Sequence, residues 1–160
     1  MKNLKAAVIG CGLISKNHFK ALNNVEHTEC AAVCDIVPEK AEAAAAQYGI
    51  PEIYTDYREM LKNPDIDVVH ICTPHYLHAG MAVDALEAGK HVLCEKPMAL
   101  SESDAKRMME ARDKAGRNLG ICFQNRYNEA SVYMKKIMDS KELGEVLGAR
   151  GQVTWNRKPE

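Results

Sequence analysis

A glycine-containing segment near the N-terminus could hold a phosphate group. Gly10 and Gly12 follow an apolar run, Leu4–Ile9, and precede a helical pattern. Gly10 permits a tight turn, and Gly12 lets the backbone approach a pyrophosphate bound at the N-terminus of the next helix. Ser15 stands where a G-x-G-x-x-G pattern has its third glycine, and it is small enough to keep the helix close to the strand. Because a G-x-G pair alone is weak evidence, this segment needs support from other residues.

Asp35 provides that support. It ends the apolar run Glu29–Cys34 and follows the glycines by about 20 residues, the spacing of an acidic residue that binds ribose hydroxyls. A carboxylate there repels a 2′-phosphate, and no arginine follows it directly. The pattern therefore predicts NAD as cofactor and makes NADP less favoured. A solvated turn aspartate is the alternative interpretation.

Lys96 is the candidate catalytic residue. It lies in Glu95-Lys96-Pro97, directly after the apolar run His91–Cys94. Ligands of open α/β sheets bind beyond the carboxyl ends of the strands, and a lysine there can hold or protonate a substrate oxygen. From spacing alone, a catalytic lysine and a surface lysine in a proline turn are equally good interpretations.

The histidines do not form a metal-binding pattern. His75 and His78 follow Thr73-Pro74, and two histidines three residues apart could suggest a metal ion. No third ligand is evident near them, so no metal site is predicted. His18 is interpreted as a packing or capping residue. The remaining histidines have no evident cluster around them: His27, His70 and His91.

Apolar runs alternate with helical patterns along most of the chain. The expected strands are Leu4–Ile9, Glu29–Cys34, Asp67–Cys72, His91–Cys94 and Leu119–Phe123. The expected helices, after the one that follows the glycines, are 38–48, one that contains 81–86 and is closed by Gly89, 101–115 and 130–138. Continuously apolar strands are typical of a parallel sheet covered on both faces, so the pattern predicts an α/β, doubly wound Rossmann fold. Tyr54 and Tyr57 are interpreted as packing residues.

The C-terminal forty residues have a different pattern. Leu147–Asn156 alternates apolar and polar residues with period two, which predicts a half-buried strand of an antiparallel sheet. A lone strand of this kind is unstable without neighbours. We therefore expect a second α/β domain that begins here and is incomplete.

The composition is that of a globular protein. The 160 residues are 46% hydrophobic and 27% charged, with a net charge of -1, which gives no reason to expect nucleic acid or a membrane surface as partner. No apolar stretch approaches the ~18 residues of a membrane span. The six cysteines lie mostly in apolar runs without a Cys-x-x-Cys pair. This usage predicts reduced thiols and a cytoplasmic location.

Taken in order, these motifs resemble those of a known family. The chain resembles the N-terminal half of the glucose–fructose oxidoreductase/inositol dehydrogenase (Gfo/Idh/MocA) family over essentially its whole length. The residues that carry the resemblance are Gly10-x-Gly12-x-Ile14 with His18, Cys34-Asp35, Tyr54-Thr55-Asp56-Tyr57, Asp67-Val68-Val69, Thr73-Pro74 with His78, Ala88-Gly89-Lys90-His91-Val92-Leu93-Cys94-Glu95-Lys96-Pro97, Phe123–Asn128 and Val153–Arg157. Glu-Lys-Pro is the most specific of them.

The resemblance implies a fold and a function. Residues 1–123 would form a dinucleotide-binding Rossmann domain, and 124–160 would begin an incomplete C-terminal substrate or dimerisation domain. The family consists mostly of NAD(P)-dependent dehydrogenases of sugars, inositols and related polyols. A homo-oligomer is expected, formed through the unpaired edge of a strand at 144–157.

The resemblance also implies roles for individual residues. Lys96 would hydrogen-bond the reacting hydroxyl group and lie beside the cofactor. Gly10, Gly12, Leu13 and Ile14 would line the pyrophosphate, and Asp35 the adenosine ribose. The remaining cofactor contacts would be Thr73, Pro74 and His78 at its border, and Glu95, Gln124, Trp155 and Arg157 near the nicotinamide half.

The chain departs from the family in length. Members usually exceed 300 residues and carry a catalytic Asp and His in the C-terminal domain, for which this sequence has no counterpart. We therefore expect cofactor binding, rather than complete catalysis, from these 160 residues. Two alternatives remain: a non-catalytic NAD(H)-binding module or sensor, and a glycosidase that uses tightly held NAD transiently.

Overall fold

The computed structural model describes residues 3–154, and the chain divides into two units, Met1–Phe123 and Gln124–Glu160. The first unit contains, in order, β1 (Leu4–Ile9), α1 (Ser15–Asn24), β2 (Thr28–Cys34), α2 (Pro38–Tyr48), β3 (Glu52–Tyr54), α3 (Tyr57–Leu61), β4 (Val68–Ile71), the 3-10 helix η1 (His75–Leu77), α4 (His78–Glu87), β5 (His91–Glu95), α5 (Glu102–Ala115) and β6 (Leu119–Cys122). The second unit contains η2 (Gln124–Tyr127) and α6 (Glu129–Ser140).

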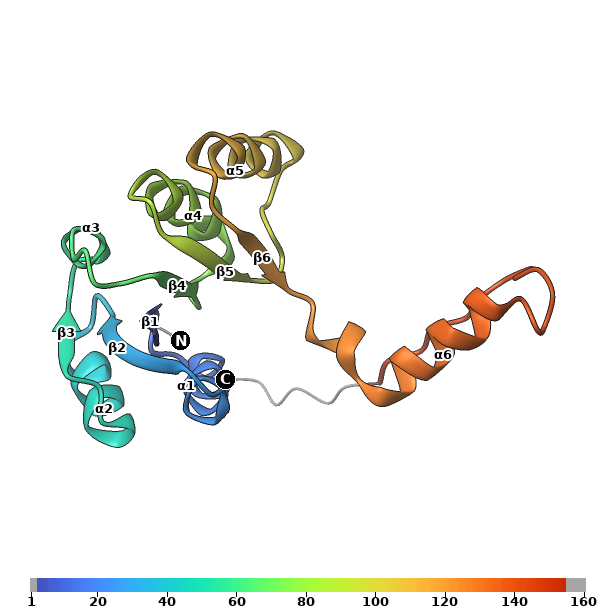
Figure 1. The fold of residues 1–160 in the computed structure, drawn as a ribbon, viewed down its shortest axis with the longest axis horizontal. Coiled ribbons are helices and arrows are strands. Elements are labelled where there is room, and N and C mark those ends of the chain that lie inside the picture. The colour runs from blue at the N-terminus through green and yellow to red at the C-terminus, as the bar shows by residue number, and fades with distance from the viewer. Residues whose placement is uncertain (1–2, 155–160) are drawn as a thin grey trace. The chain divides into compact units, whose positions relative to one another are not determined.

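The strands of the first unit form one parallel sheet in the order β3-β2-β1-β4-β5-β6 (Figure 1). This order reverses between β1 and β4, where successive connections leave to opposite sides. It is the order of a doubly wound, dinucleotide-binding sheet. The predicted Rossmann fold is confirmed.

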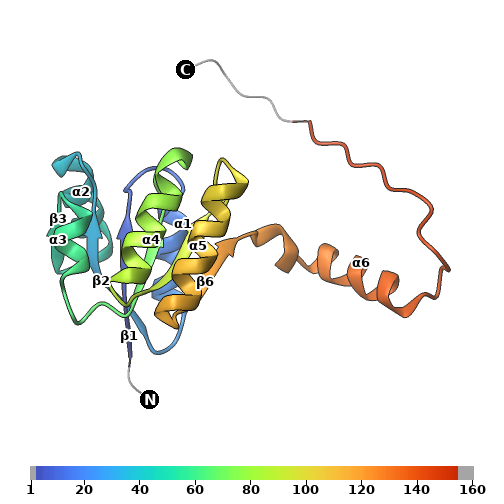
Figure 2. The ribbon, with the colours of Figure 1, turned by 90° about the horizontal axis from the view of Figure 1, so that it is seen from above.

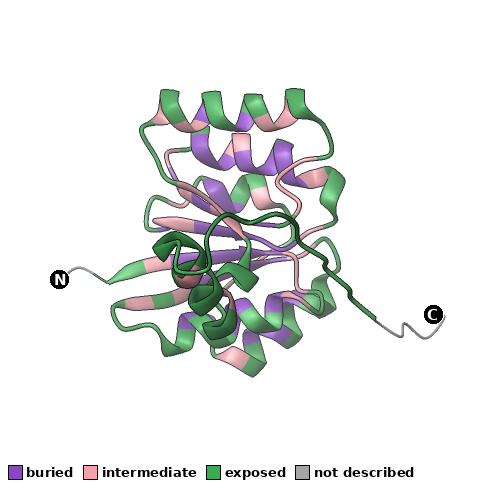
Figure 3. Ribbon diagram, turned by 90° about the vertical axis from the view of Figure 1, so that its right-hand side faces the viewer, coloured by how far each residue is buried: buried purple, intermediate pink, exposed green. Residues whose placement is uncertain are grey.

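Helices cover both faces of the sheet (Figure 2). On one face, Phe19 and Leu22 of α1 and two alanines of α2 pack against Ala6, Val8 and Val33. On the other, α3, α4 and α5 contribute Met60, Leu86 and Met108 to the core. Figure 3 shows the buried strand interiors between these layers. Both faces of the sheet are shielded from water, which explains why β1, β2 and β4 read as continuous apolar runs.

Local sequence signals set several helix ends. Pro38 occupies the first turn of α2, and Gly49 ends it at φ 69°. Ser101 begins α5 by accepting the Asp104 N–H at 3.1 Å, and Gly116 ends it at φ 62°. A fixed proline φ suits a helix start, and glycine tolerates the left-handed conformation of a helix end.

One pair of elements was not predicted, and one expected strand does not form in the described residues. The short β3–α3 pair was missed, and Tyr54 and Tyr57 belong to these two elements. The strand predicted over Leu147–Asn156 does not form in the described part, because 146–154 has no regular structure; Trp155 and Asn156 lie outside the described residues. Alternation of apolar and polar residues alone does not produce a strand, because a strand needs a partner strand to pair with.

Helix α6 was predicted over Ala130–Met138, and the structure places it over Glu129–Ser140. None of its residues is buried, so its amphipathic pattern is not used for packing in the described residues. Within residues 3–154, no helix combines the length and apolar character needed to cross a membrane.

Candidate functional site

A cavity of about 860 Å³ lies at the carboxyl ends of β1, β2 and β4. This is the point where the strand order of the sheet reverses, and open α/β sheets bind ligands there. The residues that line the cavity are Ile9, Gly10, Gly12, Leu13, Ile14, Cys34, Asp35, Ile36, Val37, Lys40, Thr55, Asp56, Tyr57, Arg58, Cys72, Thr73, Pro74, Tyr76, Leu77 and Met81.

The two glycines of the first loop meet different constraints. Gly10 has φ 92°, and a Cβ on it would lie 2.7 Å from the Cys72 carbonyl oxygen. Only glycine fits this close approach of β1 to the end of β4. By contrast, a Cβ on Gly12 would have no atom within 4 Å, so its hydrogen faces open space at the cavity wall. This bare backbone is the surface that a pyrophosphate needs.

Helix α1 begins beside that loop without a side-chain cap. Its N-cap, Ile14, supplies no side-chain hydrogen bond, and its first turn contains no acidic residue. The Ser15 hydroxyl donates to the Gly12 carbonyl oxygen at 2.7 Å and so ties the loop to the helix without capping the helix N–H groups. These N–H groups and the helix dipole therefore favour an anion.

Asp35 connects the end of β2 to the glycine loop. Its Oδ2 accepts the Cys11 N–H at 2.7 Å, and its Oδ1 accepts the Val37 N–H at 2.9 Å. An ionised carboxylate has about four acceptor positions, so capacity remains for two ribose hydroxyls. The residues at hand thus fit a dinucleotide: bare backbone for the pyrophosphate and an oriented carboxylate for the ribose.

Part of the cavity wall was not predicted from the sequence. Ile36, Lys40, Arg58 and Tyr76 all line it, and Ile36 is 86% exposed beside the ribose-binding position. Arg58 belongs to α3, and its guanidinium lies 4.6 Å from the centre of the Tyr57 ring. These residues carry no motif.

One signal for this missed region was available. Asp56 is the N-cap of α3 and accepts the Arg58 N–H, so an Asx start to a helix could have been inferred after Tyr54-Thr55. The Tyr57 hydroxyl then donates to Asp84 at 2.6 Å. Burial, followed by this hydrogen bond, raises the pKa of Tyr57 to about 12.

His78 lies behind the cavity wall rather than in it. The side chains of Thr73 and Pro74 line the cavity, whereas His78 is fully buried. Its Nε2 lies 3.0 Å from the Thr73 carbonyl oxygen and its Nδ1 lies 2.8 Å from the Pro97 carbonyl oxygen. His78 therefore links the loop after β4, which contains Thr73 and Pro74, to the turn that contains Lys96 and Pro97.

The residues expected near the nicotinamide lie in different parts of the chain. Lys96 is exposed just after β5, and Glu95 is only 5% exposed; neither lines the cavity. Gln124 lies in the second unit and is exposed. Trp155 and Arg157 lie outside the described residues.

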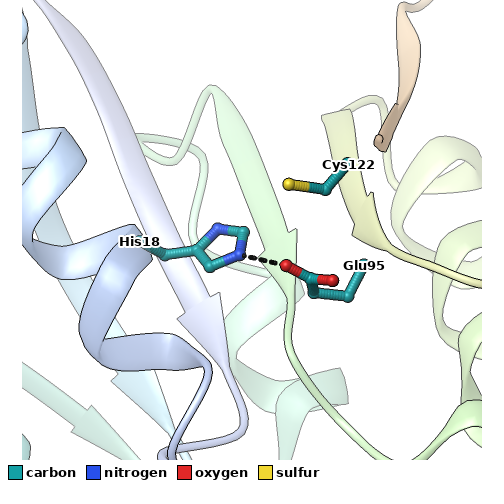
Figure 4. A group of neighbouring side chains, drawn as sticks. All are labelled: His18, Glu95 and Cys122. Atoms are coloured by element: carbon teal, nitrogen blue, oxygen red, sulfur yellow. Dashed lines mark hydrogen bonds and ion pairs between the residues drawn. The ribbon is translucent and has the colours of Figure 1, made fainter. Parts of the chain in front are cut away.

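A buried polar cluster lies next to β5, where none was expected (Figure 4). His18 Nε2 is 3.1 Å from Glu95 Oε1, and His18 Nδ1 is 3.0 Å from His70 Nδ1. His18 was interpreted as a packing or capping residue; it is buried, and it also makes these polar contacts. The interpretation of His70 as lacking a cluster was wrong, because the fold brings α1, β4 and β5 together. The Cys122 thiol completes the cluster: its sulfur and the His18 and Glu95 donor atoms lie within 4.8 Å of one another.

Comparison with known proteins agrees with this geometry. Residues 4–123 match the family described as "Oxidoreductase family, NAD-binding Rossmann fold". The chain belongs to this family. The match covers the whole sheet and every residue that lines the cavity, so the resemblance inferred from the motifs is confirmed.

Several relatives are dehydrogenases. The chain is 41% identical to an inositol 2-dehydrogenase of Salmonella typhimurium over 152 aligned residues. The alignment covers 93% of this chain and 45% of the relative. The scyllo-inositol dehydrogenase of Lactobacillus casei, solved with NAD(H) and scyllo-inositol, is 27% identical with a TM-score of 0.85 over 90% of this chain and 43% of that one. The WlbA dehydrogenase of Bordetella pertussis, solved with NADH and UDP-GlcNAcA, is 35% identical with a TM-score of 0.85. That comparison covers 89% of this chain and 44% of the WlbA chain.

This chain therefore spans slightly less than half the length of such relatives.

Proposed function

We propose that this chain forms the nucleotide-binding part of an NAD-dependent dehydrogenase that oxidises a CH–OH group of a sugar, an inositol or a related polyol. The observation that carries the proposal is the contact of Asp35 with the Cys11 N–H at 2.7 Å. This contact places an oriented carboxylate beside the bare backbone of the glycine loop. A bound nicotinamide supplies the hydride acceptor, and the residues of the chain supply binding and orientation.

Each part of the site has a distinct role in this proposal. The Gly12 backbone and the N-terminus of α1 hold the pyrophosphate, and Asp35 accepts the ribose hydroxyls. Lys96 hydrogen-bonds the substrate hydroxyl oxygen and eases the loss of its proton. Lys96 fits this role because it is exposed at the carboxyl end of β5, two strands from β1 in the sheet.

Cofactor binding is tested by titrating the chain with NADH and, in parallel, NADPH, using calorimetry and NADH fluorescence. Tighter binding of NADH is expected, because Asp35 repels a 2′-phosphate. Asp35→Ser removes the carboxylate. The ratio of the Kd for NADPH to the Kd for NADH should then fall by at least about tenfold, equal to about 1.4 kcal/mol. A wild-type chain that binds neither nucleotide would refute the proposal.

Lys96 is tested separately from the cofactor. Lys96→Ala should leave the Kd for NADH within about twofold of the wild-type value, because Lys96 does not line the cavity. In a chain that turns over a polyol, the same substitution should lower kcat by about 10²-fold or more, the lower end of the range for acid–base assistance. A collapse of NADH affinity would instead make Lys96 a cofactor ligand.

The proposal extends to compartment and assembly. All six cysteines lie in the described part of the chain and none forms a disulfide, which supports a reducing compartment such as the cytoplasm. Homo-oligomer formation also remains part of the proposal, although the edge strand first expected to mediate it is not formed in 146–154. Sedimentation over a range of concentrations tests it.

A further inference from the structure

A continuous chain of polar contacts inside the first unit ends at the backbone of Lys96. His70 Nδ1 contacts His18 Nδ1 at 3.0 Å, and His18 Nε2 contacts Glu95 Oε1 at 3.1 Å. The second carboxylate oxygen, Glu95 Oε2, accepts the N–H of Lys96 at 3.1 Å. None of the three side chains lines the nucleotide cavity, so direct cofactor contact does not account for them.

The sheet register brings these groups to one place. His70 of β4 pairs with Leu93 of β5, and Glu95 lies two residues further along β5. Because alternate residues of a strand share a face, His70 and Glu95 project toward the same side of the sheet. Val8, the β1 partner of His70, packs with Phe19 of α1 on that side. The His18 side chain therefore projects from α1 toward β4 and β5, where it contacts His70 and Glu95.

Proton positions follow from the contacts. An ionised carboxylate only accepts hydrogen bonds, so His18 donates to Glu95 through Nε2–H. Burial first, and the neighbouring His18 second, lower the pKa of His70 to about 4, so His70 is neutral at pH 7. The Nδ1 atoms of His18 and His70 face each other at 3.0 Å, so one of them carries a proton and donates it to the other.

We propose that His18 is a positioning residue for Lys96. By donating to Glu95 Oε1, it fixes the carboxylate whose other oxygen holds the Lys96 N–H, and thereby fixes the direction in which the lysine side chain leaves β5. His78 restrains the other side of the same turn through the Pro97 carbonyl oxygen at 2.8 Å. The inference rests on the proposed role of Lys96 in the reaction.

The cluster suits positioning better than general stabilisation. His18 and Glu95 are 6% and 5% exposed, and taking such groups out of water offsets much of their mutual attraction. What the arrangement provides is a defined geometry at the base of an exposed, flexible side chain. A reacting group must be held close to its productive orientation, and only the backbone of Lys96 is held by the fold.

The experiment measures amide hydrogen exchange and the Cε–Hε resonances of Lys96 by NMR in the 160-residue chain. His18→Leu should accelerate Lys96 amide exchange by about tenfold or more, because it removes the donor that holds Glu95. His18→Gln retains an N–H donor and should restore most of the protection and the wild-type Cε–Hε resonances. His27→Gln, at an exposed histidine, is the matched control and should change neither.

A second variant, Glu95→Gln, tests the same inference if His18→Leu does not fold. Glu95→Gln keeps the shape of the side chain, but its one carbonyl oxygen can serve only one of the two donors, His18 and Lys96. It should also accelerate Lys96 exchange, and adding it to His18→Leu should produce little further effect, because both act through the same carboxylate.

Several outcomes would overturn the inference. One is unchanged Lys96 exchange in folded His18→Leu; another is unchanged exchange in Glu95→Gln. A third is stoichiometric Zn²⁺ binding by the wild-type chain that displaces the His18–Glu95 contact, because the cluster would then be a metal centre that includes Cys122. NADH titration of the same samples reports separately on the proposed function, so failure of either can be recognised.

Discussion

At the scale of single residues, the two glycines of the first loop, Gly10 and Gly12, meet different constraints. Gly10 is required by its positive φ and by the Cys72 carbonyl oxygen, 2.7 Å from where its Cβ would be. Gly12 meets no such constraint from the protein. The fold therefore requires the first glycine, whereas the second is the one proposed to contact the pyrophosphate. Substitutions should separate these roles.

Gly10→Ala should lower the free energy of unfolding by about 2–4 kcal/mol, because it adds left-handed strain and overpacking against backbone. Gly12→Ala should leave stability within about 0.5 kcal/mol, the range for surface changes, but weaken NADH binding by about tenfold or more, since its methyl group enters the space for the pyrophosphate. Urea unfolding and calorimetry measure the two effects. Equal stability losses in both variants would contradict this division.

His70 should make stability depend on pH. The pKa of its imidazole is about 4 in the fold, against 6.5 ordinarily, so between these pH values the unfolded chain binds more protons. The free energy of unfolding should therefore fall as the pH drops from about 7.5 to 5, with about 2 kcal/mol of the loss due to His70. Urea unfolding of wild type and His70→Gln at both pH values tests this. The variant should have the shallower pH dependence, and identical slopes would refute the assignment.

At the scale of elements, side-chain contacts connect several of the loops at the carboxyl edge of the sheet. Asp35 ties the β2 end to the glycine loop, and His78 ties the β4 end to the β5 turn. Helix α5 carries no cavity residue; its contribution is to cover the sheet through Met108 and Ala111. A substitution in α5 should therefore change the stability of the protein without changing its affinity for the nucleotide.

Ser101→Ala tests that separation. The Ser101 hydroxyl caps α5 by accepting the Asp104 N–H, so its loss should reduce stability by about 1 kcal/mol. NADH affinity should stay within about twofold of wild type. Thermal unfolding and calorimetry on the same sample measure both. An affinity loss that matched the stability loss would show that α5 is coupled to the cavity.

At the scale of the whole molecule, the two units differ in how much they bury. The first contains all of the core residues, whereas the described part of the second has none. The first unit also contains every residue of the nucleotide cavity. We therefore expect it to fold and to bind the cofactor without the second unit.

A chain ending at Phe123 tests this expectation. Its unfolding transition should remain cooperative, because the core clusters are complete within 1–123. Its Kd for NADH should stay within about threefold of the value for the 160-residue chain. Calorimetric unfolding and NADH titration are the measurements. Loss of cooperative folding would show that residues after 123 complete the core.

The sequence alone determined most of the fold. Apolar runs, helix-capping residues and the Gly10/Asp35 spacing act locally or as simple patterns, and they indicated the strands, the long helices and the cofactor class. The same local reasoning failed over the described residues 147–154, because alternation predicts a strand only if a partner strand is present.

Only the tertiary structure decided which distant side chains meet. His18, His70 and Glu95 lie on α1, β4 and β5, up to 77 positions apart in the chain, and no local pattern records that they share a face. The sheet register and the packing of α1 create this contact. Likewise, His78 was expected at the cofactor border, but its burial places it behind the wall, because tertiary packing rather than residue type sets where a side chain lies.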